Sequence, residues 1–554
     1  MKIIRTFCLL VLASGMALGQ TSQPTSSNVA DDLKSLREAI AAQQKQIAEQ
    51  QKQLEMLQKQ LDAKTSATPH VENATLTTNA PAYNTPVVQA DVEKPKTSPL
   101  SVRIGGTEFT PGGFVDFTNI FRTTNTGSAV STAFNAIPFS NTPAGNLTEF
   151  RSSGQYSRFN LKVNGTYGAN KFNGYIEADF NGNDAANVFV TTNPHTFRLR
   201  LYYLQLARGS WEFTAGQAWG LLTPNKIGVG ASPSDLDTTI ATDGNIMTGV
   251  MYSRDAQLRV AFKPTDHFGW ALAVSNPQQN TAGQPALPAA FAAILNPSQV
   301  DGAAAAGVPN LIPDITTKLA YDTNPTGKNL HLEAGGLITS AQIAVPSPGA
   351  PSTGPFTKNS VIGGGGFGGF GYSLTKKFRV LAHGMYGAGV GRYFIGFGPQ
   401  FVVRPIQISP TTFSAEPSMV HAGSGYGGFE WQAGSKTQIG GYYGGIYYAR
   451  NAFTDVTAPA NGAGLRPNIG FGFGPVIGPT PALSFAGSGT NNNRAIQQGE
   501  LVIAQTFWKN PQYGAVVLAS DSSYVTRAPW FFLSTAPKNA HMFMTKLDLK
   551  YVLP

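Results

Sequence analysis

Charge and long hydrophobic runs are both scarce in this sequence. Only 13% of its 554 residues are Asp, Glu, Lys or Arg. Beyond the first twenty residues, no apolar run approaches the roughly 18 residues that a membrane-spanning helix requires. These shortages exclude a transporter built of transmembrane helices. The single cysteine, Cys8, lies within those first residues, which excludes disulfide bonds and a cysteine nucleophile from the rest of the chain.

Glycine and aromatic residues are distributed unevenly. Residues 20–100 contain no glycine and one aromatic residue, Tyr83, whereas residues 101–554 contain 59 of the 61 glycines. Two physically different parts therefore share the chain. Residues 1–19 precede both and resemble a secretory signal peptide, because positive charge at Lys2 and Arg5 is followed by an apolar stretch and a small-residue cleavage site.

The first part predicts a coiled coil and a linker. Within residues 31–64, Leu33, Ile40 and Ile47 begin a hydrophobic repeat of seven residues that continues to Leu61, which is typical of helices that associate. Residues 65–100 are rich in Pro, Thr and Asn without any apolar period, and we interpret them as an extended linker.

Residues 101–554 alternate between apolar and polar side chains. In 157–167, Phe159 and Leu161 fall on one face, with Arg158 and Asn160 on the other. A strict period of two predicts β-strands.

The same alternation recurs in residues 196–207. There we expect Leu199 and Leu201 to face outward, opposite Arg198 and Arg200.

The lengths of the connections distinguish a membrane barrel from a soluble sandwich. Long and short gaps alternate along the chain, as in outer-membrane barrels with short periplasmic turns and long outer loops. We therefore predict an all-β transmembrane barrel of sixteen antiparallel strands over 101–554, with eighteen left open, and both ends of the barrel domain in the periplasm. The predicted strands are 110–122, 156–167, 171–181, 196–207, 211–219, 256–263, 268–276, 314–323, 329–340, 358–373, 377–390, 421–434, 437–450, 495–509, 512–526 and 540–553.

Motifs for catalysis, cofactors and metals are missing from the sequence. The seven histidines are scattered without HExxH, and no GxSxG nucleophile elbow occurs. Glu177 and Asp179 could suggest acid–base chemistry, but solvated carboxylates inside a pore are far commoner. We expect no enzyme activity, no cofactor, no metal site and no nucleic-acid partner.

Several short motifs resemble a known family. Ser157-Arg158-Phe159, Glu177-Ala178-Asp179-Phe180, Arg198-Leu199-Arg200-Leu201 and Gly216-Gln217-Ala218-Trp219 follow one another behind the predicted coil. This order is similar to that of the DcaP-like porins of Gram-negative outer membranes. The resemblance implies a homotrimer of sixteen-stranded channels for small negatively charged solutes, with a periplasmic coiled coil.

Basic side chains predominate at the expected inward positions. Residues 101–554 carry 30 Lys and Arg against 22 Asp and Glu, and the clearest strands give eleven basic inward positions against six acidic ones. Such an excess favours anions in a pore. The residues we predict to line the pore or bind solute are Arg158, Lys162, Glu177, Asp179, Arg198, Arg200 and Arg259.

The sequence therefore predicts an outer-membrane porin for passive diffusion of small hydrophilic solutes, favouring anions such as carboxylates. One alternative is a structural protein that tethers the membrane to the periplasmic layer through its coil, with the lumen closed by the Ala-rich loop 285–306. Another is a barrel enzyme acting on lipids, for which no nucleophile and base are found.

The heptad repeat gives the first testable prediction. Isolated residues 31–64 should associate, as trimers if the resemblance holds, because Leu33, Ile40 and Ile47 begin one apolar seam. Analytical ultracentrifugation over a range of concentrations measures this directly. A monomer at every concentration would contradict it.

Overall fold

The structure is a computed structural model, and its described part begins at residue 98. The predicted signal peptide, coiled coil and linker up to residue 97 lie outside the described residues. In the described part, no helix is both long and apolar enough to cross a bilayer. The described ranges are 98–182, 196–241, 247–277, 286–295, 299–300, 309–325, 329–394, 398–473, 493–532 and 536–554.

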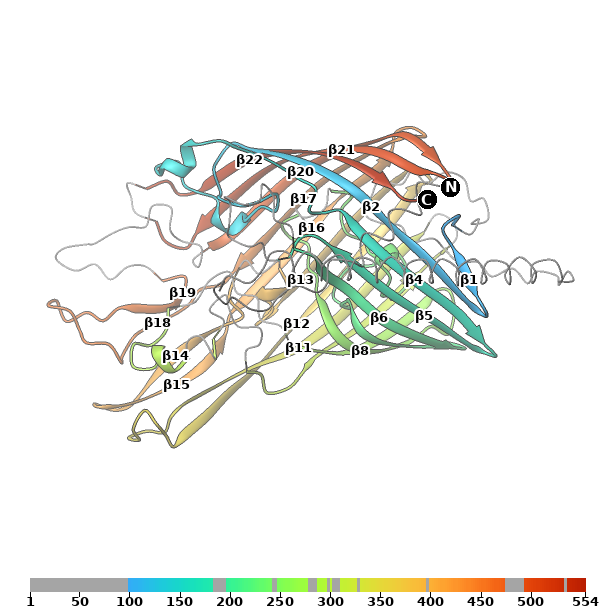
Figure 1. The fold of residues 1–554 in the computed structure, drawn as a ribbon. Helices are drawn as coiled ribbons and strands as arrows, with labels where there is room; N and C mark the ends of the chain where they lie inside the picture. Colours follow the sequence, from blue (N-terminus) through green and yellow to red (C-terminus); the bar gives the residue numbers. More distant parts are fainter. Residues whose placement is uncertain are drawn as a thin grey trace, which may run out of the picture. The chain divides into compact units, whose positions relative to one another are not determined.

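Sixteen antiparallel strands form a closed barrel (Figure 1). Each strand pairs with its neighbours along the chain, and the last strand pairs with the first through Phe114–Val552 to Arg122–Met544. The strands of the wall are β2 (Thr107–Arg122), β4 (Arg158–Tyr167), β5 (Asn170–Asp179), β6 (Arg198–Arg208), β7 (Trp211–Trp219), β8 (Arg254–Phe262), β9 (Phe268–Ser275), β10 (Asp314–Asp322), β11 (Leu330–Pro346), β12 (Phe356–Thr375), β13 (Phe378–Ala388), β16 (His421–Gln432), β17 (Thr437–Tyr448), β20 (Asn493–Asn510), β21 (Gly514–Pro529) and β22 (Ala540–Val552).

This count confirms the prediction of sixteen strands, and every predicted strand has its counterpart. Two further short strands, β1 (Val102–Ile104) and β3 (Glu149–Ser153), pair with β2 at its two ends and add no new position to the wall. The Ser98 hydroxyl donates to the Pro554 carbonyl at 2.9 Å. The described chain therefore enters and leaves the barrel at the end that carries the short turns.

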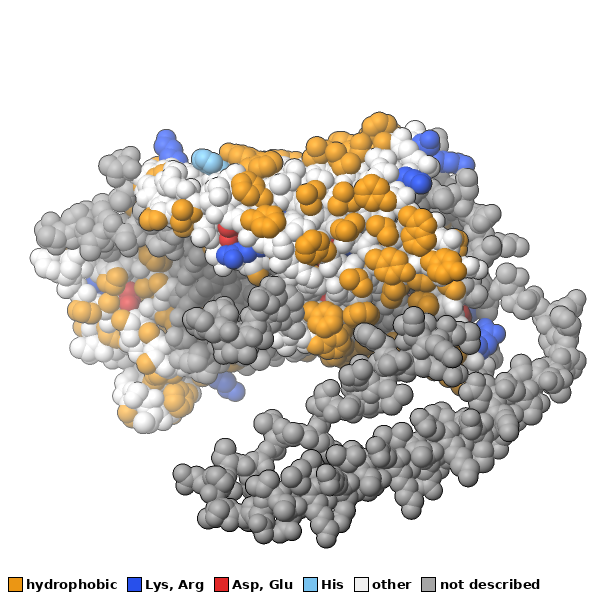
Figure 2. Space-filling model, turned by 45° about the horizontal axis from the view of Figure 1, so that its top comes forward, with side chains coloured by type: hydrophobic (Ala, Val, Ile, Leu, Met, Phe, Trp, Pro, Cys, Tyr) orange, Lys and Arg blue, Asp and Glu red, His pale blue; other side chains and the backbone are white. Residues whose placement is uncertain are grey.

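Alternation along the strands separates an apolar outer face from a polar inner one. On β4, Phe159 and Leu161 are 45% and 36% exposed, whereas Arg158 and Asn160, which alternate with them, are 6% and 7% exposed. Figure 2 shows hydrophobic side chains distributed over the outer wall. The outward direction that the sequence predicted for β4 is confirmed.

One predicted direction is wrong. Leu201, expected to face outward with Leu199, is completely buried. The register of β5 and β6 shifts so that Ala178 pairs with Leu199 and Glu177 with Leu201, which leaves Arg200 as an extra residue. This β-bulge turns two consecutive side chains, Arg200 and Leu201, toward the interior.

The long-loop end carries structure that the alternation did not predict. β11 and β12 continue as a hairpin beyond the wall, pairing as far as Pro346 with Phe356. The connection after β13 contains the hairpin β14 (Phe401–Ser409) and β15 (Thr412–Met419), and the connection after β17 contains β18 (Asn451–Thr454) and β19 (Asn468–Phe471). The sequence predicts loops for both connections, and the two hairpins are a difference from that prediction.

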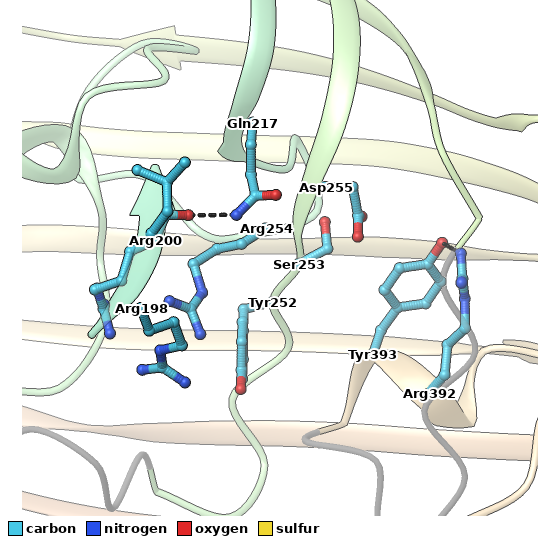
Figure 3. A pocket seen from close by; sticks show the side chains of 10 residues that line it. Arg198, Arg200, Gln217, Tyr252, Ser253, Arg254, Asp255, Arg392 and Tyr393 are labelled. Atoms are coloured by element: carbon cyan, nitrogen blue, oxygen red, sulfur yellow. Dashed lines mark hydrogen bonds between the residues drawn. The ribbon is translucent and has the colours of Figure 1, made fainter. Parts of the chain in front are cut away.

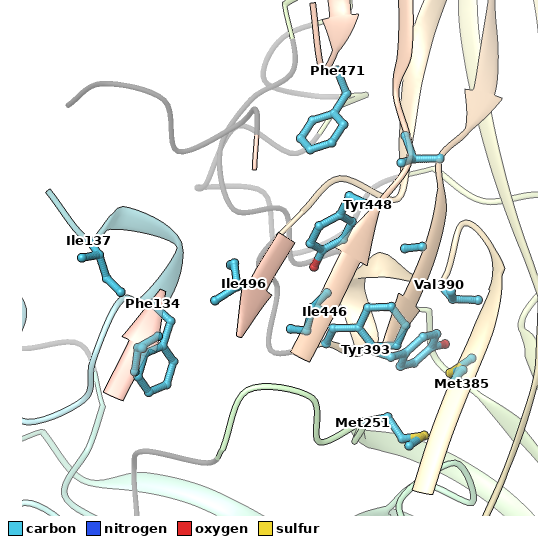
Figure 4. Packing of buried hydrophobic residues seen from close by; sticks show 14 of the residues in the cluster. Phe134, Ile137, Met251, Met385, Val390, Tyr393, Ile446, Tyr448, Phe471 and Ile496 are labelled. Carbon is cyan, nitrogen blue, oxygen red and sulfur yellow. The ribbon is translucent and has the colours of Figure 1, made fainter. Parts of the chain in front are cut away.

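Apolar side chains fill part of the interior at the same end. The connection between β2 and β3 contains the 3₁₀ helices η1 (Phe134–Ala136) and η2 (Pro143–Asn146), and the connection after β13 contains η4 (Gly391–Tyr393). Buried side chains of these two connections pack against inward residues of β17 and β20 (Figure 4). Prominent members of this cluster are Phe134, Ile137, Tyr393, Ile446, Tyr448 and Ile496.

The separation of faces leads to a stability prediction. Leu161→Arg should cost about 2 to 4 kcal/mol if the site lies near the bilayer midplane, because an arginine on the lipid face loses its water. Asn164→Arg, on the inner face of the same strand, should cost much less. Denaturant unfolding of the protein refolded into lipid vesicles measures both, and equal costs would contradict the assignment of the two faces.

Candidate functional site

The described residues of the connection between β7 and β8, 220–241 and 247–253, fold into the barrel and pack against its inner wall. Leu221, Val229, Leu236 and Met247 in this inner segment are at most 2% exposed. In the tether alternative, the Ala-rich loop 285–306 is the segment expected to close the lumen. Described residues of that loop instead join a cluster at the long-loop end, where Phe291 and Leu295 pack with residues of β11, β14 and β15.

The inner segment is anchored first on β10 and β11. Lys318 Nζ lies 2.8 Å from a Glu333 carboxylate oxygen and donates at 2.8 Å to the Asn225 side-chain oxygen. The Asn225 backbone N–H donates to Glu333 at 3.1 Å, and the Gly228 N–H donates to Asp322 at 2.8 Å. Charged side chains of the wall thus hold the backbone of the segment.

A second anchor joins the inner segment to β13. Arg379 donates two hydrogen bonds to the Asp237 carboxylate, at 2.7 and 2.6 Å, and His383 Nε2 lies 3.2 Å from it. Burial opposes ionisation of Asp237, but Arg379 and His383 hold the pKa of its carboxyl well below the usual range. This carboxylate therefore stays charged throughout the neutral range.

Further hydrogen bonds attach the segment across the barrel. The Ile240 N–H donates to the Tyr442 hydroxyl at 3.0 Å, and the Thr248 N–H donates to the Gln498 side-chain oxygen at 2.8 Å. Because Tyr442 belongs to β17 and Gln498 to β20, the segment spans the interior and constricts it.

Five of the predicted site residues form one group, which we name the β5–β6 charge cluster: Arg158, Glu177, Asp179, Arg198 and Arg200. Arg198 donates to both Asp179 oxygens, at 2.9 and 2.7 Å. Arg200 donates to Glu177 and to Asp179, each at 2.8 Å. Arg158 Nε lies 3.7 Å from Glu177. The bulge at Arg200 allows one guanidinium to reach both carboxylates.

Pairing within this cluster largely neutralises its charge. Three guanidinium groups face two carboxylates, which leaves one positive charge in excess. Glu177 also accepts a hydrogen bond from the Tyr175 hydroxyl at 2.8 Å. The cluster is consequently a rigid polar network rather than a row of free arginines.

The other two predicted site residues lie elsewhere. Lys162 is half-buried on β4, and its register partner on β5 is Tyr175. Arg259 on β8 is 3% exposed, and its Nε and Nη2 have no hydrogen-bond partner among the described residues. Parity along a strand predicts that Lys162 and Arg259 face inward but cannot distinguish their depth, so the sequence could not separate them from the cluster.

A cavity of about 240 Å³ adjoins the cluster at the long-loop ends of β6, β7 and β8 (Figure 3). Arg198 and Arg200 of its lining were predicted from the sequence as pore-lining residues, but the other lining residues were not, among them four that matter for its chemistry. Arg254 and Asp255 were missed because the predicted strand began at residue 256, and Arg392 and Tyr393 because they lie in a long connection. The lining residues that matter below are Arg198, Arg200, Arg254, Asp255, Arg392 and Tyr393.

The buried charges of the structure are mostly acidic. Among the described residues, fourteen buried side chains are Asp or Glu and nine are Lys or Arg. The eleven-to-six excess of basic inward positions stays a prediction, because a count of buried residues omits partly exposed inward side chains such as Arg198 and Arg379 and includes residues of the connections such as Asp237. The positions of individual charged side chains along the pore, rather than their total number, therefore decide any ion preference. The described residues contain no cluster of three or more His, Cys, Asp or Glu suited to a metal ion.

Fold and site together define a constricted sixteen-stranded β-barrel, the class to which outer-membrane channels belong. No protein-family model matches this sequence, and no curated protein matches it. Among solved structures, the outer membrane channel DcaP of Acinetobacter baumannii matches 81% of this chain and 99% of its own, with a TM-score of 0.51 and 14% identity. The predicted DcaP-like resemblance is therefore confirmed at the level of the fold.

Two further solved structures are similar at lower scores. OmpT of Vibrio cholerae, expressed in the outer membrane, has a TM-score of 0.40 and 10% identity over 82% of this chain and 99% of its own. OprB of Pseudomonas putida has a TM-score of 0.39 and 9% identity over 80% of this chain and 94% of its own.

The anchor at Asp237 generates a prediction. Asp237→Ala leaves Arg379 and His383 without that carboxylate, and breaking a buried pair in this way costs about 3 to 5 kcal/mol. We expect a lower thermal midpoint and a larger, noisier single-channel conductance as the inner segment loosens. Asp266→Ala, in an exposed short turn, is the matched control. Unchanged conductance in folded Asp237→Ala protein would show that the segment does not limit the pore.

Proposed function

We propose that this protein is an outer-membrane porin through which small hydrophilic solutes diffuse passively, without catalysis. The observation that carries the proposal is a closed wall of sixteen strands, apolar outside and lined with charged side chains inside. Barrels of eight strands are filled by their own side chains, whereas larger ones enclose a lumen. The described residues of the inner segment narrow this lumen and so limit the size of a solute.

A preference for anions such as carboxylates is the finer part of the proposal. The β5–β6 charge cluster supports it, because three arginines face two carboxylates. Positive side chains at a constriction attract negative solutes. The cluster lies beside the cavity at the ends of β6 to β8, so a solute entering there meets Arg198 and Arg200.

The location and the assembly of the protein are further parts of the proposal. We place the barrel in the outer membrane of a Gram-negative bacterium, with the short turns and the coiled coil in the periplasm and the long loops outside. The signal peptide, the homotrimer and a periplasmic contact through the coil rest on the sequence. The DcaP structure, which has a similar fold, is that of an outer membrane channel, and this supports the location.

A structural tether is the second candidate, and the apolar packing at the long-loop end favours it. Phe134, Tyr393 and Ile496 belong to a buried cluster there, and such packing reduces the open cross-section. A tether needs no open lumen.

Conductance separates the two candidates. The purified full-length protein is inserted into a planar bilayer, and the current is recorded in potassium chloride. Discrete, ohmic steps support a porin. Correctly folded protein that inserts without conducting supports a tether and overturns the porin.

Arg198 and Arg200 give a prediction about selectivity. Replacing both with Ala removes two positive charges and leaves Glu177 and Asp179 without their guanidinium partners. The reversal potential in a salt gradient should then shift toward cations, and folding should weaken because unpaired buried carboxylates are costly.

The matched control removes both signs of charge. Adding Glu177→Gln and Asp179→Asn to the double variant should return the reversal potential toward that of the wild type. If the double variant is folded and its reversal potential is unchanged, these arginines do not set selectivity.

A further inference from the structure

The cavity at the long-loop ends of β6, β7 and β8 brings unlike charges together. Arg198 and Arg200 reach it from β6, Arg254 and Asp255 begin β8, and Arg392 comes from η4 (Figure 3). Four guanidinium groups therefore share the lining with a single carboxylate. Such a lining attracts an anion only if some of that positive charge is uncompensated.

Three of the four guanidinium groups already pair with carboxylates. Arg198 and Arg200 pair with the carboxylates of the β5–β6 charge cluster, at 2.7 to 2.8 Å. Arg392 forms an ion pair with Asp314 of β10, and the Tyr393 hydroxyl donates to the same carboxylate. These groups can bind a solute only by exchanging an existing partner.

Arg254 differs from them. Among the described residues, no Asp or Glu forms an ion pair with it, and its guanidinium carbon lies 5.3 Å from the centre of the Trp219 ring. Tyr252 packs near the same ring, with the ring centres 5.8 Å apart. A guanidinium that rests on an aromatic face keeps its planar edge available, and that edge matches the two oxygens of a carboxylate.

We propose that this cavity binds a small organic monocarboxylate and that Arg254 is its specificity-determining residue. The inference deepens the proposed function, on which it rests, by naming the solute class and the residue that recognises it. A carboxylate takes two parallel hydrogen bonds from Arg254. Binding at Arg254 leaves the pairs of the β5–β6 charge cluster intact.

The remaining lining defines the rest of the solute. Tyr252 and Tyr393 supply aromatic surface to the lining, which suits a short hydrocarbon body. Asp255 repels a second negative charge, so a dicarboxylate of equal length binds less well. At about 240 Å³ the cavity is smaller than the roughly 300 to 1,000 Å³ typical of drug-sized sites.

Current block tests the proposal. The full-length protein is recorded in planar bilayers in potassium chloride while sodium butyrate or disodium succinate, each with four carbons, is added. Butyrate should reduce the current in a saturable way and at lower concentration than succinate. Arg254→Gln should raise the half-blocking butyrate concentration at least about tenfold, the loss of one charge-assisted pair.

Two further variants make the result specific. Arg254→Lys keeps the charge but not the planar fork, so it should restore part of the block. Arg404→Gln, which removes a half-exposed arginine paired with Glu416 at 3.3 Å on the β14–β15 hairpin, should leave the block unchanged. Folding of each variant is checked by thermal unfolding.

Several results would overturn the inference. If butyrate blocks the Arg254→Gln channel as it blocks the wild type, Arg254 does not recognise the solute. If succinate blocks at lower concentration than butyrate, the site is not selective for a single carboxylate. If the block is lost only in the Arg198 and Arg200 variant, the charge cluster recognises the solute.

Failure of the porin itself is distinguishable from failure of the site. If the wild type does not conduct, the proposed function fails, and isothermal titration of butyrate into the detergent-solubilised protein tests the cavity separately. Binding that Arg254→Gln abolishes supports the site, and a wild type that does not bind butyrate overturns it.

Discussion

Closure of the sheet is the constraint on which the rest of this structure depends. Hydrocarbon offers no hydrogen-bond partner to a peptide group, so a strand edge left open in a membrane is costly. Pairing of β2 with β22 removes both edges. Because a closed sheet has an inside and an outside, the same pairing sends Leu161 outward and Arg158 inward. The inner segment and the charge cluster exist only within that enclosure.

Most of the charged side chains inside the barrel that the structure describes stabilise its interior by pairing with one another. Removing an ionised group from water is expensive unless it is paired, and the interior meets this requirement at Lys318 with Glu333, at Arg379 with Asp237, and throughout the β5–β6 charge cluster. The first two pairs also anchor the segment that narrows the lumen. Residual charge such as that of Arg254 is thus more informative about solutes than the total number of basic residues.

The sixteen strands could be predicted because the two faces of a barrel wall have different surroundings, and this imposes an alternation with a period of two. Residues such as Phe159, Leu161 and Leu549 lie on the outer face as that alternation requires. The prediction failed where local geometry departs from it. At Leu201 a bulge inserts one residue and reverses the direction of the side chain. The hairpins β14–β15 and β18–β19 escaped notice because no membrane imposes alternation on strands beyond the wall.

By itself, the sequence determined the class of this protein: alternation and the lengths of the gaps are local properties, and a barrel wall depends on them directly. It also indicated which residue types face inward. Only the tertiary structure decided that the inner segment crosses the interior with its described residues, 220–241 and 247–253. It also decided that Arg198 and Arg200 are already paired, and that Arg254 and Asp255 share a cavity with Arg392. These are contacts between segments far apart in the chain, set by packing across the lumen, and no periodicity in the sequence records them.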